Sequence, residues 1–452
     1  MRPTKLINDV RLPGHPPDKR WDIRLSDGHI TSITPFEKPD LRKEYWPGNG
    51  CFLAPSLCHP HVHLDKAFLL SHPKYADLQI EKGTFSEAMD ITNKAKAMFE
   101  RKDLLERGRR LVNESGRAGV THMRAFVEVD PIVGLKCLEV GREIKQDYSD
   151  VSQSELCDVQ ICAFAQLPLF SGDDNGEETR RLMTEATKDE YMAEAVGSTP
   201  YVESDRNKMQ RNVEWLVDLA LEHDKHIDFH LDYNLDPDIP PLIWDAIKTL
   251  KEKQWTQRSK KTIVFGHCTR LSLFKEGEWK RLAQEIGDLP ISFVGLPTSD
   301  LYMMTSEHGA RGTLNILNMI KNYGFNAAIG INNIGNAFTP QGSCDPLFIA
   351  NLGVGLYQAG TVQDAELLYE CISTRARAAI GMAQDRMNDR QEEARFTLQA
   401  EPGQKAHCLM FNWFLPKWTS RRSIEDAVYF YDGGQNRAAL LGGRETYVEP
   451  EI

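Results

Sequence analysis

The sequence predicts an α/β fold, in which a (β/α)8 (TIM) barrel adjoins a small composite β-sandwich domain formed by both chain ends. Three observations predict it. The middle of the chain alternates short apolar segments, typical of buried strands, with amphipathic helical patterns. Short strand-and-turn patterns occur at both ends. A chain of 452 residues is also long enough for one large domain and one small one.

The middle of the chain carries the barrel pattern. Eight strand and helix pairs within about 330 residues fit a barrel of parallel strands. The clearest helical stripe lies in residues 207–223, and helices are also expected at 242–253 and 365–381. An open, doubly wound sheet is the alternative, although neither a dinucleotide fingerprint nor a P-loop follows a strand. The expected strands are residues 52–58, 120–129, 157–165, 194–202, 226–232, 262–266, 290–296 and 326–332.

The two chain ends resemble each other as small β units. We expect residues 1–53 and 395–452 to form the sandwich, and residues 54–394 to form the barrel. A turn is expected at 26–28, where Ser-Asp-Gly separates two short apolar runs. The expected strands of this unit are residues 5–10, 21–25, 29–34, 407–413, 426–431 and 438–441.

Composition restricts the possible partners and location. The formal net charge of -11 argues against a nucleic-acid or anionic membrane surface as partner, although a local basic patch is compatible with this charge. No apolar run of about 18 residues predicts a membrane span. Nine scattered cysteines without a CxxC pair, and an N-terminus without an apolar signal segment, predict reduced thiols and a cytoplasmic protein.

The most informative motif is His61-x-His63, which follows an apolar run ending at Pro55. Side chains two apart on a strand point the same way, so these imidazoles converge at about the spacing that one divalent ion bridges. His-x-His also arises by chance in a chain with 13 histidines. His230 and His267 each end a later strand candidate, where the catalytic groups of a barrel gather, and they strengthen the prediction of a metal site.

Taken in order, these motifs resemble the amidohydrolase superfamily, in the branch of cytosine deaminase and N-isopropylammelide isopropylaminohydrolase. The resemblance covers essentially the whole chain. The matching pieces are His61-Val-His-Leu-Asp-Lys66, Gln166, Gly197-Ser-Thr-Pro200 with Glu203, His230-Leu-Asp, Gly266-His267, residues 296–302 and residues 330–338.

The resemblance implies one divalent metal ion, Zn or Fe, with His61, His63 and His230 as ligands and His267 as an oxyanion-stabilising or catalytic group. Three neutral imidazoles leave an open position at which the ion activates a water molecule. The implied function is hydrolysis of C–N (non-peptide) bonds in a small cyclic amidine or amide, as in a cytosine deaminase-like deaminase. A homo-oligomer is a further expectation from the resemblance. The expected substrate-binding residues are Lys66, Gln166, Glu203 and Asn332. For Lys66 and Gln166, a salt bridge and a cap are the structural alternatives.

Four departures from the family pattern matter. Asn332 stands where an acidic metal ligand and proton carrier is expected, and Tyr233 stands where a proton-shuttling Glu is expected. An amide is a weak ligand and takes no proton at neutral pH. Loss of both acids would remove general acid-base contributions of roughly 10²–10⁴ each. Phe126 replaces a His, and His59 replaces an acidic residue. His59 either joins the metal cluster or packs or hydrogen-bonds beneath the site, and we expect the second.

Two carboxylates are candidates to replace the missing acids. Asp232 follows His230 by two residues and would point to the same side, and Asp300 ends the seventh strand. Each is otherwise a loop carboxylate or a helix cap. The alternative function is a catalytically weakened relative that binds a ligand or acts as a scaffold, because of Asn332 and Tyr233. A purely structural zinc site is disfavoured because no cysteine cluster is present.

Overall fold

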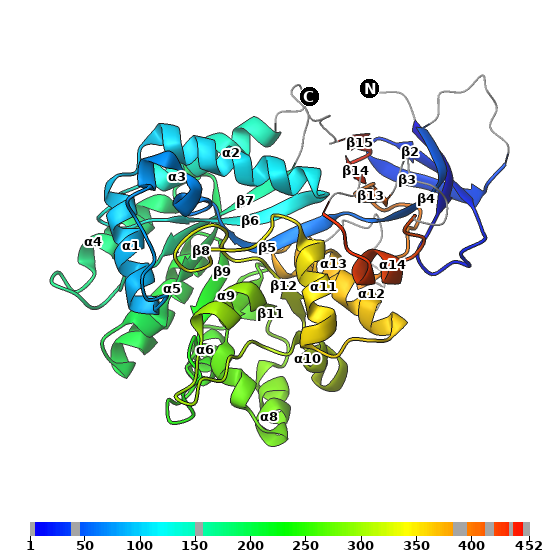
Figure 1. The fold of residues 1–452 in the computed structure, drawn as a ribbon. Coiled ribbons are helices and arrows are strands. Elements are labelled where there is room, and N and C mark those ends of the chain that lie inside the picture. The colour runs from blue at the N-terminus through cyan, green and yellow to red at the C-terminus, as the bar shows by residue number, and fades with distance from the viewer. Residues whose placement is uncertain are drawn as a thin grey trace.

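The computed structural model describes residues 5–37, 46–149, 157–382, 396–411, 420–433 and 437–445. Two sheets organise them (Figure 1). An eight-stranded sheet is wrapped by helices, and a seven-stranded sheet from the two chain ends lies beside it. The α/β fold predicted from the sequence is therefore confirmed.

The eight-stranded sheet is a parallel barrel whose strands follow chain order from β5 to β12. Just beyond β12, the backbone N–H of Asn332 donates to His61 O (3.1 Å), and the backbone N–H of His63 donates to Asn332 O (2.8 Å). These two bonds join the last strand to the first. Sequential order and this closure exclude the doubly wound alternative. The strands are β5 Leu57–His63, β6 Val120–Glu128, β7 Asp158–Ala165, β8 Ala193–Ser198, β9 His226–Leu231, β10 Ile263–His267, β11 Ile291–Gly295 and β12 Ala327–Ile329.

Helices cover the outside of the barrel. The expected helix at 207–223 is α5, which Asp205 caps by accepting from Lys208 N. The expected helix at 365–381 is divided, because Ser373 leaves the helical conformation and its Oγ donates to Ser56 O. The α-helices here are α1 Phe85–Ala97, α2 Arg101–Arg117, α3 Lys136–Ser149, α4 Glu177–Ala186, α5 Arg206–Glu222, α6 Ile243–Glu252, α7 Trp255–Arg258, α8 Glu276–Ile286, α9 Pro297–Met303, α10 Ile316–Tyr323, α11 Pro346–Leu356, α12 Val362–Cys371 and α13 Thr374–Ala379. Short 3-10 turns are η1 Leu69–Ser71, η2 Pro73–Tyr75, η3 Asp189–Tyr191, η4 Pro200–Val202 and η5 Thr269–Leu273.

The second sheet pairs the two chain ends, as the sequence predicts. Its strand order is β15-β14-β13-β4-β1-β2-β3, and β13 runs antiparallel to β4, with Leu409 opposite Ala54. Residues 412 and 413 of the expected strand at 407–413 lie outside the described residues. The strands are β1 Lys5–Arg11, β2 Trp21–Ser26, β3 His29–Pro35, β4 Trp46–Pro55, β13 Cys408–Phe411, β14 Arg437–Leu441 and β15 Arg444–Glu445.

The strand expected at 426–431 is wrong, because this segment forms helix α14 (Ile424–Tyr429). Ser423 caps the helix by accepting from Asp426 N. Ile424, Ala427 and Val428 are buried at helical spacing. The buried residues therefore recur with the period of a helix and not of a strand.

The strand expected at 52–58 is also different in the structure, where two strands meet at Ser56. The apolar run before Ser56 belongs to β4 of the second sheet, and β5 begins at Leu57 and extends through His63. Ser56 O accepts from Ser373 Oγ (2.6 Å) and Arg377 Nη1 (2.8 Å), which fixes the crossing point. The change of sheet thus lies near the expected 53/54 boundary, whereas the boundary at 394/395 lies outside the described residues. The division into two domains stays a prediction.

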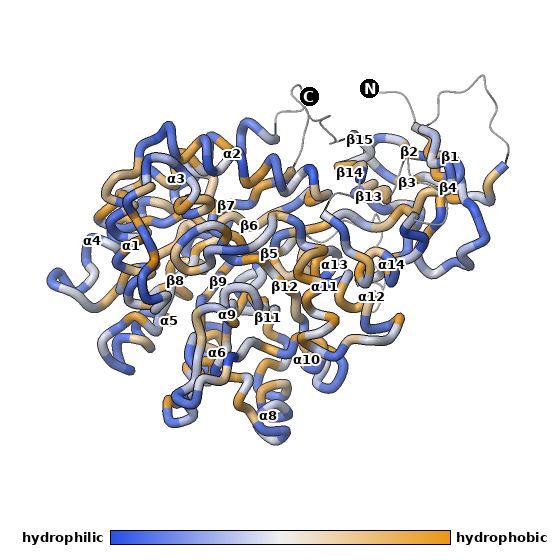
Figure 2. Tube along the Cα trace, viewed as in Figure 1, coloured by the Kyte–Doolittle hydropathy of each residue, from blue (hydrophilic) through white to orange (hydrophobic). Residues whose placement is uncertain are grey.

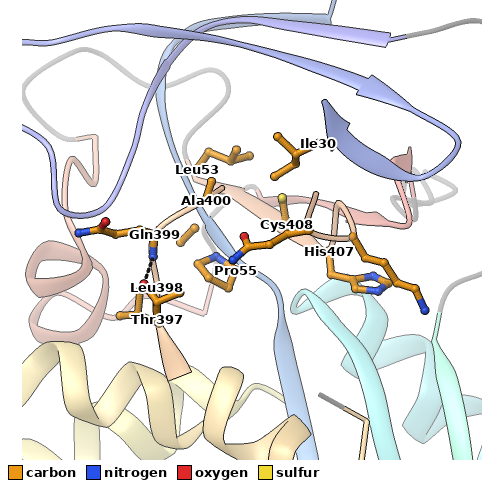
Figure 3. Close-up of a pocket in the computed structure, with 12 residues that line it drawn as sticks. Ile30, Leu53, Pro55, Thr397, Leu398, Gln399, Ala400, His407 and Cys408 are labelled. Atoms are coloured by element: carbon orange, nitrogen blue, oxygen red, sulfur yellow. Dashed lines mark hydrogen bonds between the residues drawn. The ribbon is translucent and has the colours of Figure 1, made fainter. Parts of the chain in front are cut away.

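The core lies between the barrel strands and their helices, and a second, smaller cluster fills the end sheet. Figure 2 shows hydrophobic residues concentrated along the strands and along α11. A cavity of about 20 Å³ beside Ile30, Leu53 and Cys408 has room for about one water (Figure 3). All nine cysteines lie in the described segments, and all are buried free thiols. Within those segments, no helix is long and apolar enough to cross a membrane.

Candidate metal and substrate site

Three histidines from two barrel strands meet at the C-terminal end of the barrel. His61 and His63 belong to β5, and His230 belongs to β9. His61 Nε2 and His63 Nε2 each lie 3.1 Å from His230 Nε2, and all three side chains are buried. Bonds of about 2.0–2.1 Å to a tetrahedral zinc ion place two ligand nitrogens about 3.3–3.4 Å apart. The three nitrogens are therefore spaced as ligands of one ion.

The electrostatics of this cluster suit metal binding. Burial lowers the pKa of His61, and lowers that of His63 and His230 well below the usual value. Neutral imidazoles keep the lone pair that a metal requires. We expected His61, His63 and His230 to converge, and the geometry brings them together.

Asp228 lies beside the Nδ1 atom of His61, on the side of the ring away from the other two histidines' Nε2 atoms, and the sequence did not identify it. The Asp228 Oδ1 atom lies 3.5 Å from His61 Nδ1, and its Oδ2 accepts from Arg124 Nη1 at 2.8 Å. Metal-bound histidines commonly direct their second nitrogen to a carboxylate. The available signal was position, because Asp228 precedes His230 by two residues on the same strand and therefore shares its face.

Two phenylalanines pack against the histidine rings. The Phe126 ring centroid lies 4.1 Å from that of His61 and 5.1 Å from that of His63. The Phe164 ring centroid lies 4.3 Å from that of His230. Both phenylalanines are buried, so this side of the cluster is an apolar wall.

His267 and Asp300 form a hydrogen-bonded pair next to the cluster. His267 Nδ1 lies 2.7 Å from Asp300 Oδ1, and the Asp300 Oδ2 atom accepts from Thr313 Oγ1 at 2.6 Å. An ionised Asp300 accepts from Nδ1–H, which leaves His267 Nε2 with the lone pair. The His267 ring centroid is 5.0 Å from that of His230, so this base lies beside the metal-ligand cluster. His267 and Asp300 are thus both brought to the site, although Asp300 lies in α9 and not at the end of the seventh strand as expected.

The prediction that Asp232 acts as a catalytic acid is contradicted by its geometry. Its backbone turns to a φ of 48° directly after β9, so the strand alternation that would place it beside His230 ends there. The carboxylate accepts from Leu242 N (2.6 Å) and Ile243 N (3.0 Å) at the start of α6. Burial raises the pKa of Asp232 to about 6, although these two amides oppose the shift. Asp232 caps a helix.

Glu203 likewise stabilises a loop and is not placed among the residues lining the site. Its carboxylate accepts from Leu169 N (2.7 Å), Ser171 Oγ (2.6 Å) and Asn212 Nδ2 (2.8 Å). This buried carboxylate ties the loop after β7 to α5. Its expected contact with substrate is therefore replaced by a structural role.

Lys66 lies at the wall of the site in a buried ionic cluster. Its Nζ atom is 2.6 Å from Glu128 Oε1 and 3.5 Å from Gln166 Oε1. Lys96 of α1 donates to both Glu128 and Asp130. Burial opposes ionisation of Glu128, but Lys66 and Lys96 outweigh it and lower the Glu128 pKa to about 2. Lys66 therefore forms a salt bridge with Glu128 and also lines the site.

Asn332 contributes both backbone and side chain. Its φ is 58°, and its buried Oδ1 atom has no hydrogen-bond partner among the described residues. Together with Lys66, Gln166, Tyr233 and His267, it lines a chamber of about 20 Å³ around the histidine cluster, which we call the inner chamber. An unpartnered buried carbonyl oxygen facing a polar chamber is a position at which a ligand is expected.

His59 is not part of the metal-ligand cluster. Its Nε2 atom lies 3.1 Å from Ser115 Oγ and 3.1 Å from Cys344 O. Burial lowers the His59 pKa to about 4, so the ring is neutral. His59 packs outside the barrel interior, in keeping with the packing role predicted for it.

Comparison with known proteins identifies the architecture. The chain matches, at 20% identity and a TM-score of 0.79, the structure of 5-methylcytosine deaminase from Klebsiella pneumoniae liganded with 5-fluorocytosine, with 97% of this chain and 96% of that chain covered. This chain has the fold of the amidohydrolases. N-isopropylammelide isopropylaminohydrolase from Burkholderia multivorans matches at 19% identity and a TM-score of 0.73, over 98% and 97% of the two chains.

A zinc-containing structure also shares this architecture. Atrazine chlorohydrolase from Arthrobacter aurescens complexed with zinc matches at 14% identity and a TM-score of 0.67, over 98% of this chain and 94% of that one. In sequence, an uncharacterized protein of Escherichia coli (strain K12), YahJ, is 23% identical over 350 residues, which are 75% of this chain and 67% of that protein. No family model matches the chain.

Proposed function

We propose that this protein is a metal-dependent hydrolase acting on a C–N bond, other than a peptide bond, of a small cyclic amidine or amide. The convergence of three buried neutral imidazoles at the C-terminal end of the barrel carries the proposal. Relatives in fold include deaminases and hydrolases of small cyclic compounds, which supports the same reaction class.

His61, His63 and His230 would hold one divalent ion, Zn or Fe, and the zinc named in a structural relative supports Zn. Such an ion lowers the pKa of a bound water to about 7 and supplies a nucleophile at neutral pH. The nitrogen-only ligand set suits both metals.

The surrounding side chains would divide the remaining work. His267, polarised by Asp300, would take a proton at Nε2 from the attacking water and return it to the leaving nitrogen. The Lys66 ammonium and the Gln166 amide bind the polar edge of the substrate ring. The His267–Asp300 pair thus supplies acid-base chemistry that Asn332 and Tyr233 cannot. We also propose a cytoplasmic location, and the expected homo-oligomer stays a prediction.

A second function, ligand binding without turnover, is favoured by one observation. Asn332 brings an amide in place of a carboxylate to the wall of the inner chamber. In that case the pocket would bind the same class of small cyclic compound without hydrolysing it.

Elemental analysis of the purified protein tests the proposed function. About one equivalent of Zn or Fe is expected, together with ammonia or amine release from pyrimidines, triazines or cyclic amidines. His61→Ala should lose the metal and the activity. His59→Gln is the matched control, because it changes another buried histidine of β5 that lies outside the cluster.

Full metal content without turnover of any compound in these classes would favour the binding protein. A protein that takes up no metal after reconstitution would contradict both the ligand assignment and the hydrolase. Retention of metal by His61→Ala would contradict the ligand assignment alone.

A further inference from the structure

A second cavity lies directly outside the inner chamber. This outer cavity has a volume of about 350 Å³, whereas the inner chamber has about 20 Å³. A cavity of about 150 Å³ is enough to bind benzene, and about one water needs 10–15 Å³. The outer cavity can therefore hold a ring or a branched alkyl group, but the inner chamber in this conformation holds only a small group.

Three aromatic side chains line both spaces and separate them. Phe85, Tyr201 and Tyr233 belong to the walls of the inner chamber and of the outer cavity. Their ring centroids are 6.3 Å (Phe85 to Tyr201), 6.2 Å (Phe85 to Tyr233) and 5.9 Å (Tyr201 to Tyr233) apart. Tyr233 also contacts His267, with centroids 3.9 Å apart. One layer of aromatic rings thus separates the outer cavity from the candidate site.

The polar side chains around the outer cavity are already engaged by the protein. Asn234 Oδ1 accepts from Asp236 N at 3.0 Å. Asp232 accepts from two amides of α6, and Arg206 donates to Pro240 O (2.7 Å) and Pro241 O (3.0 Å). The Tyr233 hydroxyl donates to Ser299 O at 3.5 Å. Tyr201 hydrogen-bonds Gln166.

The surface left for a ligand is apolar. Met209, Ile239, Leu242 and Met304 supply aliphatic and thioether groups beside the three rings. Burying a charged group there would leave it without a partner, whereas an apolar group gains from leaving water.

We propose that the outer cavity is a subsite for an apolar substituent of the substrate. The substrate is then a small cyclic amidine or amide that carries an aromatic or branched alkyl substituent. Its polar ring enters toward the histidine cluster as the three aromatic side chains shift, and its substituent stays outside them. This inference rests on the proposed function for the position of the reacting group. It also assigns a role to Tyr233, which forms part of this aromatic wall at the position where a Glu is expected.

Calorimetric titration of the purified full-length protein with cytosine and N4-benzylcytosine tests the subsite. The two probes share a polar ring and differ in one apolar group. N4-benzylcytosine should bind with a Kd at least about tenfold lower than cytosine. Met209→Trp fills the outer cavity and should reduce this advantage below about threefold, with cytosine binding unchanged.

Two further variants keep the result interpretable. Ile239 is 44% exposed at the cavity, so Ile239→Trp should obstruct it without disturbing the core. Met98→Trp, at the far end of α1 from Phe85, is the control and should leave both affinities unchanged. An affinity for N4-benzylcytosine equal to or weaker than that for cytosine in the unmodified protein would overturn the proposal. Failure of both probes to bind would also overturn it. An advantage that survives in both cavity-filling variants would also overturn it.

The outcome separates the subsite from the proposed function, because the ratio of the two affinities and the metal content of the protein are measured independently. A protein that contains metal but shows no benzyl preference remains a candidate hydrolase without this subsite. A protein without metal that keeps the benzyl preference has the subsite but is not a metal-dependent hydrolase.

Discussion

Asn332 has two separable functions at the level of the single residue. Its backbone joins the last barrel strand to His61 and His63, and its left-handed φ of 58° is one that Asn and Asp adopt more readily than other side chains. Its side-chain oxygen is unpartnered among the described residues. Asparagine and aspartate are nearly isosteric, so the backbone function survives an exchange of one for the other.

Asn332→Asp should therefore strengthen metal binding without disturbing the fold. A carboxylate is a far better ligand for a divalent ion than an amide, and metal affinity is expected to rise by at least about tenfold. Competition with a chromogenic chelator measures the change. Asn333→Asp is the matched control, since it adds the same charge one residue away, where Oδ1 already accepts from Asn336 Nδ2 at 2.8 Å. Equal gains in both variants would mean that the added charge acts at long range and not as a ligand.

The sequence predicts some site residues better than others, for a physical reason. His61 and His63 could be assigned from strand alternation because β5 extends through both. Asp232 could not be placed in this way, because its positive φ ends the alternation after β9. A positive φ does not change the hydropathy pattern of the sequence. Asp228 was missed although its position carried a signal, since a buried carboxylate on a strand is recognised only once its partner is known.

At the scale of elements, the barrel strands were predictable because each is a short apolar run between helical patterns. Two errors occurred where one apolar run serves two sheets, as at Ser56, and where a short segment fits both periods, as in α14. The strand expected at 194–202 is also shorter, because residues 200–202 form the turn η4. Strand β9 also begins with a buried polar residue at the end remote from the metal-ligand cluster. His226 Nδ1 accepts there from Thr262 N at 2.9 Å.

His226 should make the stability of the protein depend on pH. Burial lowers its folded-state pKa to about 3 from the usual 6.5. Below pH 6.5 the unfolded chain binds a proton that the folded protein does not, so stability is lost as pH falls from 6.5 towards 3. His226→Asn keeps the acceptor and should reduce the slope of unfolding free energy by up to about 1.4 kcal/mol per pH unit.

Urea unfolding at several pH values between 4 and 7 measures this slope. It should remain positive in the variant, because burial also lowers the pKa of His59 and His407. His308→Asn, in an exposed loop, is the control and should leave the slope unchanged. A slope that His226→Asn does not alter would show that the ring is protonated in the folded state.

At the scale of the whole molecule, the candidate ligands lie far apart in the sequence and meet only in the folded barrel. His61 and His230 are 169 residues apart. The overall fold could be predicted because the spacing of apolar residues follows the periods of strands and helices along the whole chain. The outer cavity could not, since its walls come from several loops and helices whose spacing is set by packing.

Removal of metal should therefore destabilise the whole protein. An ion that binds the folded chain at about 100 times its Kd adds about 2.7 kcal/mol of stability, so a chelator should lower the Tm by at least about 3 °C. Differential scanning calorimetry with and without EDTA measures the difference. His61→Ala should have the lower Tm from the outset and show no response to EDTA. An EDTA response of equal size in His61→Ala would place the stabilising ion elsewhere.

The position of β4 in the end sheet has a consequence for synthesis on the ribosome. Its apolar residues Cys51 and Phe52 pair with β1 on one side, and Phe52 and Leu53 pair with β13 on the other. Since β13 is translated last of the three, β4 has an open hydrogen-bonding edge while the entire barrel is being made. Open apolar edges recruit strands from other chains. A nascent chain, or one shortened before residue 408, would therefore need a chaperone to avoid aggregation at the very strand that leads into the histidine motif.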